Sequence, residues 1–154
     1  MADQPEAVRE GDALDWVALE TFLRAALPEL GGPLEVFQFP GGLADHLKEQ
    51  IGGRECVTSQ FFSGTQDFPG EEQGRVEWAV AWREEGDGFV HSYCNTVPTP
   101  EGGTHEAGLR SALLRGLKAH GERTGNKRAQ IITAEDVMTS AAALLSVFIR
   151  EPEF

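Results

Sequence analysis

Residues 75–82 read RVEWAVAW, and large apolar side chains alternate with charged or small ones along the whole stretch. Successive side chains of a β-strand point to opposite faces, so this alternation predicts a half-buried strand with one apolar face. That face carries Val76, Trp78, Val80 and Trp82. After a turn-forming EEGDG, the run FVHSYCNTV at 89–97 shows the same period, and we expect the two runs to pair as an antiparallel hairpin.

Helical and extended patterns surround this expected hairpin. Apolar residues at three- and four-residue steps predict helices, and glycine or proline marks where they end. Thr133, followed three residues later by Asp136, is a capping-box variant. The expected elements are helices at 12–27, 43–51, 104–123 and 133–143, strands at 34–39, 56–62 and 144–150, and a loop at 63–74. This order predicts an α+β domain of two layers, with helices on one face of a mixed, mainly antiparallel sheet.

The composition allows one domain with a core of its own. The chain has 154 residues, of which 40% are hydrophobic, and no apolar run is long enough to cross a membrane. The N-terminal residues show no apolar signal core, so we expect a cytoplasmic protein. Cys56 and Cys94 lack the spacing of a redox or zinc motif, and buried free thiols are expected rather than a disulfide.

The charge is strongly acidic but unevenly distributed. A formal net charge of −12 predicts poor binding of nucleic acid by the isolated chain. Residues 104–128 have a local basic excess, which either contacts a phosphate backbone or an acidic partner, or forms a solvated helix face followed by a basic loop. The basic residues there are Arg110, Arg115, Lys118, Arg123, Lys127 and Arg128, and the acidic ones are Glu106 and Glu122.

Catalytic and metal-binding templates do not match this sequence. It contains no GxxxxGK[ST], no GxGxxG after a strand, no HExxH and no GxSxG. The four histidines, His46, His91, His105 and His120, lack the spacing of zinc ligands. His120 falls on the apolar side of the long helix and is expected to be packed, and His91 is expected at a core or edge position of its strand.

The stretch Gly102-Gly103-Thr104-His105 opens the long helix. A glycine pair before a helix can cradle a phosphate, and a histidine beside Glu106 can hold a metal or move a proton. A structural corner explains the same residues: the glycines allow positive backbone angles and Thr104 is a good N-cap. The carboxylates of Glu101 and Glu106, on either side of this stretch, would also repel an anion. We therefore expect a structural corner, formed with Asn95, and no catalytic, cofactor or metal ligands.

Several long stretches resemble one family. SYCNTVPTPEGGTHEAGLRSALLRGLKAHGE (92–122), TGNKR (124–128) and ITAEDVMTSAAALLSVFIREPEF (132–154) resemble the ATPase subunits of bacterial type II topoisomerases. The resemblance runs from about Phe37 to Phe154 and is closer to the B subunit of topoisomerase IV than to that of gyrase. It implies a junction helix followed by part of a transducer domain, with a ribosomal-protein-like βαβ fold, in the range 41–154.

The resemblance also implies what this piece does and lacks. In the parent enzyme the transducer couples ATP hydrolysis to movement of the DNA gate, with ATP, magnesium, the DNA-cleaving subunit and DNA as cofactors and partners. No stretch matches the nucleotide-binding domain, and the family's Gln-Thr-Lys loop follows the point where this chain ends. Phosphoryl transfer needs both, so we expect the chain not to hydrolyse ATP alone.

The N-terminal segment departs from this family. Residues 1–11 are polar and expected to be disordered. Residues 12–40 predict a helix and a strand ending in Phe-Pro-Gly, and 1–36 resemble the start of aminoglycoside-phosphotransferase-like kinases. The chain is then either a chimera or a topoisomerase fragment with an N-terminal extension. An alternative function is an interaction module that forms a homodimer or pairs with another chain through an exposed sheet edge.

Overall fold

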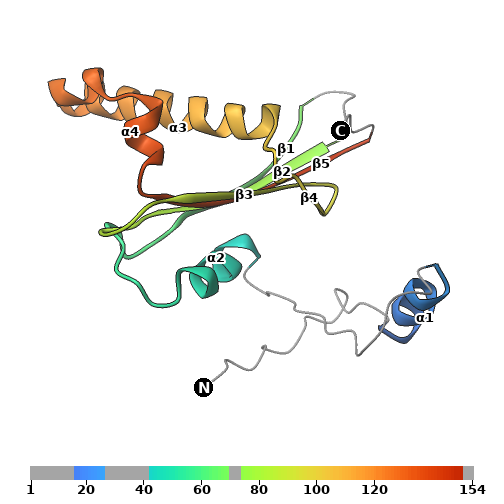
Figure 1. Ribbon diagram of the computed structural model, residues 1–154. Helices are drawn as coiled ribbons and strands as arrows, with labels where there is room; N and C mark the ends of the chain where they lie inside the picture. The colour runs from blue at the N-terminus through green and yellow to red at the C-terminus, as the bar shows by residue number, and fades with distance from the viewer. Residues whose placement is uncertain (1–15, 27–41, 70–73, 151–154) are drawn as a thin grey trace. The chain divides into compact units, whose positions relative to one another are not determined.

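The computed structural model describes residues 16–26, 42–69 and 74–150 (Figure 1). They belong to two compact units, Met1–Gly42 and Leu43–Phe154. In the first unit, α1 (Trp16–Ala26) confirms the core of the expected helix, with an i,i+4 ion pair of 2.8 Å between Arg24 and Glu20. The expected disorder at 1–11 and the expected strand at 34–39 lie outside the described residues.

The second unit is built on a five-stranded sheet in the order β1-β2-β5-β3-β4 (Figure 1). Its strands are β1 (Phe62–Asp67), β2 (Gly74–Trp82), β3 (Phe89–Cys94), β4 (Val97–Pro98) and β5 (Ala141–Ile149). Of the four pairings only β3 with β5 is parallel. The mixed, mainly antiparallel α+β class is therefore confirmed, and β2 forms where the alternating sequence predicted it.

The expected hairpin between β2 and β3 is wrong, because β5 lies between these two strands. β5 is buried from Ala141 to Val147, and a strand that is apolar on both faces belongs in the middle of a sheet. The loop between β2 and β3 passes over the start of β5: Arg83 N–H donates to Ser140 O at 2.9 Å and Gly88 N–H donates to Thr139 O at 2.7 Å. The short loop between β2 and β3 thus crosses the start of β5, a strand that comes later in the sequence.

Two further boundaries differ from the sequence prediction. Of the expected strand at 56–62, Cys56 makes an isolated bridge to Arg83, and β1 forms instead within the expected loop. Gly64 explains this position, since a Cβ there would lie 2.6 Å from the Trp78 indole, so the ring packs on bare backbone. The helix expected at 133–143 ends at Met138, and the alanines at 141–143 belong to β5, where small side chains fit beneath the covering helices.

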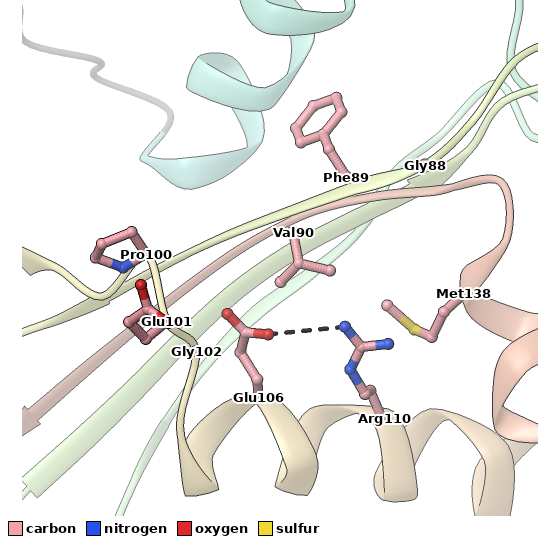
Figure 2. A pocket seen from close by; sticks show the side chains of 9 residues that line it. All are labelled: Gly88, Phe89, Val90, Pro100, Glu101, Gly102, Glu106, Arg110 and Met138. Carbon is pink, nitrogen blue, oxygen red and sulfur yellow. Dashed lines mark ion pairs between the residues drawn. The ribbon is translucent and has the colours of Figure 1, made fainter.

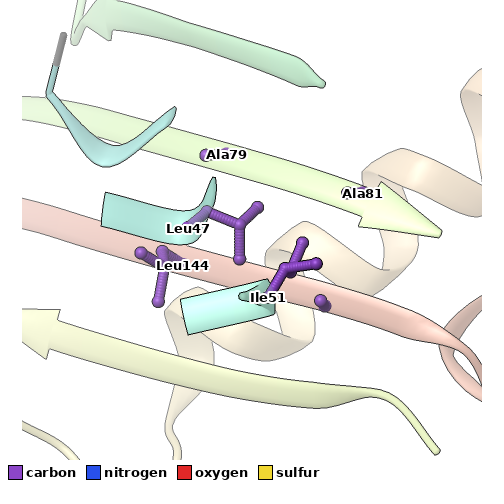
Figure 3. Packing of buried hydrophobic residues seen from close by; sticks show 6 residues of the cluster. Leu47, Ile51, Ala79, Ala81 and Leu144 are labelled. Atoms are coloured by element: carbon purple, nitrogen blue, oxygen red, sulfur yellow. The ribbon is translucent and has the colours of Figure 1, made fainter. Parts of the chain in front are cut away.

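Helices cover both faces of the sheet. On one face Leu47 and Ile51 of α2 (Leu43–Ile51) pack on Ala79, Ala81 and Leu144 (Figure 3). On the other face, α3 (Thr104–Thr124) and α4 (Ala134–Met138) pack on the alternate strand residues, whose side chains point away from α2. The strand residues of this cluster are Val80, Ala141 and Ala143, and the helices contribute Leu113, Val137 and Met138. The expected placement on one face thus holds for α3 and α4, whereas α2 covers the opposite face. The strand expected to be half-buried is therefore buried on both sides from Ala79 to Ala81.

Local features of this unit agree with the sequence. The capping box of α4 is confirmed: Asp136 N–H donates to Thr133 Oγ1 at 3.1 Å, and Thr133 N–H donates to Asp136 Oδ2 at 2.8 Å. The backbone hydrogen bond from Thr133, followed by that from its hydroxyl, lowers the pKa of Asp136. Cys56 and Cys94 are free thiols; Cys94 is buried as expected, but Cys56 is only half-buried, so its expected burial is wrong. Among the described residues, no helix has the length and apolar character needed to span a membrane.

The first prediction concerns the middle of the sheet. Leu144 is fully buried between α2 and the neighbouring strands, so Leu144→Ala leaves a cavity and should lower the free energy of unfolding by about 3 kcal/mol. Leu117→Ala is the matched control, because Leu117 is 38% exposed and should cost less than about 1 kcal/mol. Urea denaturation of both variants checks this, and equal losses would contradict the packing described.

Candidate functional site

The β3–β4 connection places Asn95 at the end of the central strand. Asn95 and Thr96 form the two-residue turn with φ of 48° and 70°, as a hairpin of the I′ type requires. The Asn95 side chain accepts from Ile149 N–H at 2.9 Å and donates to Ile149 O at 2.8 Å. Its backbone N–H donates to Val147 O at 2.8 Å. Asn95 therefore binds the last residue of β5. It does not take part in the glycine corner, where the sequence analysis placed it.

The glycine corner joins β4 to α3. Gly102 has φ of +75°, a left-handed conformation that favours glycine, and its N–H donates to Thr99 O at 2.9 Å. Gly103 is extended and is itself the N-cap of α3, without a side-chain hydrogen bond. The expected N-cap role of Thr104 is therefore wrong, since Thr104 is the first helical residue. A Cβ on Gly103 would lie 2.8 Å from the His105 ring, which leaves no room for a side chain there.

A chain of polar contacts, which we call the corner hydrogen-bond chain, lies beneath this corner. His105 Nε2 is 3.1 Å from Thr99 Oγ1, which is 2.6 Å from Ser92 Oγ. Ser92 Oγ is in turn 2.6 Å from Glu106 Oε1. Ser92 is only 4% exposed, so its hydroxyl needs protein partners. These contacts connect the middle of β3 to the first turn of α3.

The donors in this chain follow from counting protons. An ionised Glu106 only accepts, and each hydroxyl has one proton to donate. The Ser92 hydroxyl is 3.3 Å from Thr99 O and 2.6 Å from Glu106 Oε1, and we assign its proton to the shorter contact. Thr99 O–H then donates to Ser92, and His105 Nε2–H donates to Thr99. The reverse direction would leave one hydroxyl donating twice. In this assignment His105 Nε2 is the donor at one end of the chain and Glu106 is the acceptor at the other.

Arg110 extends the chain toward a small cavity. Its Nη2 lies 3.7 Å from Glu106 Oε2, an ion pair one helical turn along α3 (Figure 2). The pair borders a cavity of about 300 Å³ between α3, Pro100, Val90 and Met138. The Arg110 side chain is 44% exposed, so the pair contributes little to stability. Among the described residues no cluster of three or more acidic, histidine or cysteine side chains suits a metal ion.

The remaining histidines lie away from this corner. His120 is exposed, so its expected packing on the apolar side of α3 is wrong. His91 is exposed at its edge of the sheet, and its Nδ1 lies 3.1 Å from Gln50 Oε1 of α2. Gln50 Nε2 also lies 2.9 Å from His46 Nε2. Burial lowers the pKa of His46, against the opposing effect of Glu49, and nearby His91 lowers it further.

An open apolar groove of about 730 Å³ runs between α3 and the β1–β2 side of the sheet. Its floor includes Trp78 and Val147, and its α3 wall includes Leu109 and Leu117. Phe62 at its rim is 51% exposed, so the described part of the chain leaves the groove open to solvent. The apolar face expected on the long helix is therefore shared between core and groove: Leu113 is buried in the core, Leu109 packs beside it, and Leu117 is exposed in the groove.

Ser92, Thr99 and Glu106 form the middle of the corner hydrogen-bond chain, a role that was not predicted from the sequence. One signal was available: Ser92 alternates in phase with Val90 and Cys94, so a hydroxyl falls on the side of β3 that faces α3. A polar residue on such a face needs a partner. The sequence did not reveal that Thr99, beyond the turn, supplies one.

A family model and curated relatives match most of the chain. The family model described as DNA gyrase B matches residues 42–154. The B subunit of DNA topoisomerase 4 from Caulobacter vibrioides is 56% identical over 126 residues, which cover 79% of this chain and 18% of the relative. Its counterpart from Rickettsia conorii is 43% identical over 145 residues, covering 94% of this chain and 21% of the relative. The chain thus spans about a fifth of the length of these curated relatives.

Solved structures show the same fold. The crystal structure of the 43K ATPase domain of Thermus thermophilus gyrase B, in complex with an aminocoumarin, superposes with a TM-score of 0.66 at 27% identity. The match covers 80% of this chain and 33% of that one. The chimera alternative, with a kinase-like origin for residues 1–36, finds no support in these comparisons, since the Rickettsia conorii relative aligns with 94% of the chain.

The second prediction concerns the two glycines of the corner. Gly103→Val should push the His105 ring off Thr99 and lower the free energy of unfolding by about 1–3 kcal/mol, and Gly102→Ala should cost about 1 kcal/mol through its positive φ. Gly116→Ala is the control: its Cβ meets open space inside α3, so it should stabilise by about 1 kcal/mol. Thermal melting checks all three, and an unchanged melting temperature for Gly103→Val would remove the corner's structural role.

Proposed function

The chain belongs to the DNA gyrase B family, and we propose that it is the junction helix and part of the transducer domain of a type II topoisomerase ATPase subunit of the topoisomerase IV kind. In this role α2 is the junction helix. The piece passes an ATP-driven rearrangement of the subunit to the DNA gate and performs no chemistry of its own. Cofactors and partners belong to the parent: ATP and magnesium, the rest of the ATPase subunit, the DNA-cleaving subunit and DNA.

The proposal rests on β5, the central strand, because helices pack on both of its faces. α2 packs on one face of β5 through Ala142 and Leu144, and α4 packs on the other face beside Ala141 and Ala143. Close-packed interiors deform little, so a force applied to α2 displaces the sheet and the opposite helices as one body. A part that transmits movement needs this rigidity and no reactive group of its own.

The proposal is tested by comparing ATP binding and hydrolysis with ATP-dependent DNA strand passage. The isolated chain should neither bind an ATP analogue saturably nor hydrolyse ATP. In an ATPase subunit that contains this chain, Leu47→Ala loosens α2 on the sheet and should slow ATP-dependent DNA strand passage about tenfold, while ATP hydrolysis stays within about twofold. Leu117→Ala, outside the core, is the control. Hydrolysis by the isolated chain, or equal loss of both activities in Leu47→Ala, would contradict the proposal.

The open groove and the sheet edge favour a second candidate function, self-association. The described residues place no strand on the outer side of β1, and Phe62 and Leu117 expose apolar surface beside it. An unpaired edge next to an apolar groove is a common route to pairing between chains. In this case a second copy of the chain covers the groove.

Sedimentation decides this second candidate. The chain should form a dimer at high concentration, and Leu117→Glu should return it to a monomer because a carboxylate would be buried in the contact. Lys118→Glu changes charge at a neighbouring position that does not line the groove and should leave the dimer intact. A monomer at every concentration would exclude self-association.

A further inference from the structure

We propose that the β3–β4 hairpin mechanically joins the end of β5 to the start of α3, with Asn95 and Thr99 as the positioning residues at its two ends. The inference deepens the proposed function, on which its biological meaning rests, by naming the route along which movement passes through this piece. It starts from two groups of hydrogen bonds that lie on the same short segment of chain.

At the first end, the Asn95 side chain takes the place of the β3 backbone, which stops pairing with β5 after Cys94. β3 ends at Cys94, yet β5 continues to Ile149 and would leave its last peptide groups without a partner on that side. The amide of Asn95 supplies one acceptor and one donor, as a peptide group does, and binds both the N–H and the C=O of Ile149. The positive φ of 48° is an uncommon conformation that aims this amide at β5. Asn95 therefore holds the β3–β4 turn against the last residue of β5.

At the second end, Thr99 binds three separate parts of the corner. Its N–H donates to Ser92 O at 2.8 Å, and its carbonyl accepts from Gly102 N–H at 2.9 Å. Its hydroxyl lies within hydrogen-bond distance of Ser92 Oγ and of His105 Nε2. Thr99 thereby fixes the first turn of α3 to β3.

The segment between these ends is short and stiff. Only residues 96–98 separate Asn95 from Thr99, and they include Pro98, whose ring fixes φ. Val97 and Pro98 also pair with Cys94 and Tyr93, so the segment is bound to β3 along its length. A displacement of Ile149 therefore reaches the first turn of α3 through a few bonded residues without a flexible joint.

Hydrogen exchange of the whole chain tests this coupling, because each end has its own reporter. Ile149 N–H donates to Asn95 Oδ1, and Ala107 N–H donates to Gly103 O in the first turn of α3. Asn95→Gly keeps the positive φ and removes the amide, and Thr99→Val keeps the shape and removes the hydroxyl. Each variant should raise exchange about tenfold at its own reporter and severalfold at the other, because energetic coupling between two sites is reciprocal.

Two controls separate coupling from general loss of stability. Thr58→Val removes a hydroxyl that donates to Gln60 O outside this segment and should leave both reporters unchanged. Asn95→Asp is a milder variant, since it keeps an acceptor for Ile149 N–H and loses the donor to Ile149 O, and it serves if Asn95→Gly does not fold. The Ala107 reporter must respond more than amides in the middle of β2 for the coupling to be specific.

The double variant completes the test. The effects of Asn95→Gly and Thr99→Val on the free energy of unfolding should be non-additive, because removing either end already frees the segment between them. Exchange changes confined to each variant's own reporter, together with additive free energies, would overturn the inference. The measurement needs no ATP, DNA or partner subunit, so its outcome is independent of whether the proposed topoisomerase role is correct.

Discussion

The rest of this structure depends on the burial of β5 on both faces. Its side chains from Ala141 to Val147 are removed from water, which commits each neighbour to a position: β2 antiparallel on one side and β3 parallel on the other. Burial of apolar surface is the dominant favourable term in folding, and in this chain it is concentrated in one strand. The two faces of β5 are covered by different helices: Ala142 and Leu144 pack against α2, and Ala141 and Ala143 pack against α4.

The polar contacts at the start of α3 have a different role. A buried hydroxyl such as that of Ser92 adds little net stability, but leaving it unpaired is costly, so the corner is restricted to the geometry in which every member is satisfied. Apolar packing alone would allow α3 to slide or rotate over the sheet. The corner hydrogen-bond chain, anchored by Glu106 and Thr99, sets one register for the helix.

Local chemistry made part of the fold and of the candidate site predictable. The alternation in β2, the capping box at Thr133 and the positive φ of Gly102 each involve only a few neighbouring residues, and all three are confirmed. Strand order depends on pairing between residues distant in sequence, so the insertion of β5 was missed. The alanines at 141–143 have a high helix propensity, but they lie in β5 because burial in the sheet outweighs that propensity. Asn95 was grouped with the glycines by proximity along the chain, whereas only the folded sheet brings it to Ile149.

The position of β5 in the chain has a consequence for how the protein is made. The strand in the centre of the sheet is the last of the five to leave the ribosome, so β2 and β3 are synthesised long before the neighbour that separates them. Until it arrives, their inner edges are unpaired and open to strands of other nascent chains. Such non-local assembly is slow, and this sheet should therefore depend on chaperones or low concentration during synthesis more than a simple meander of the same size would.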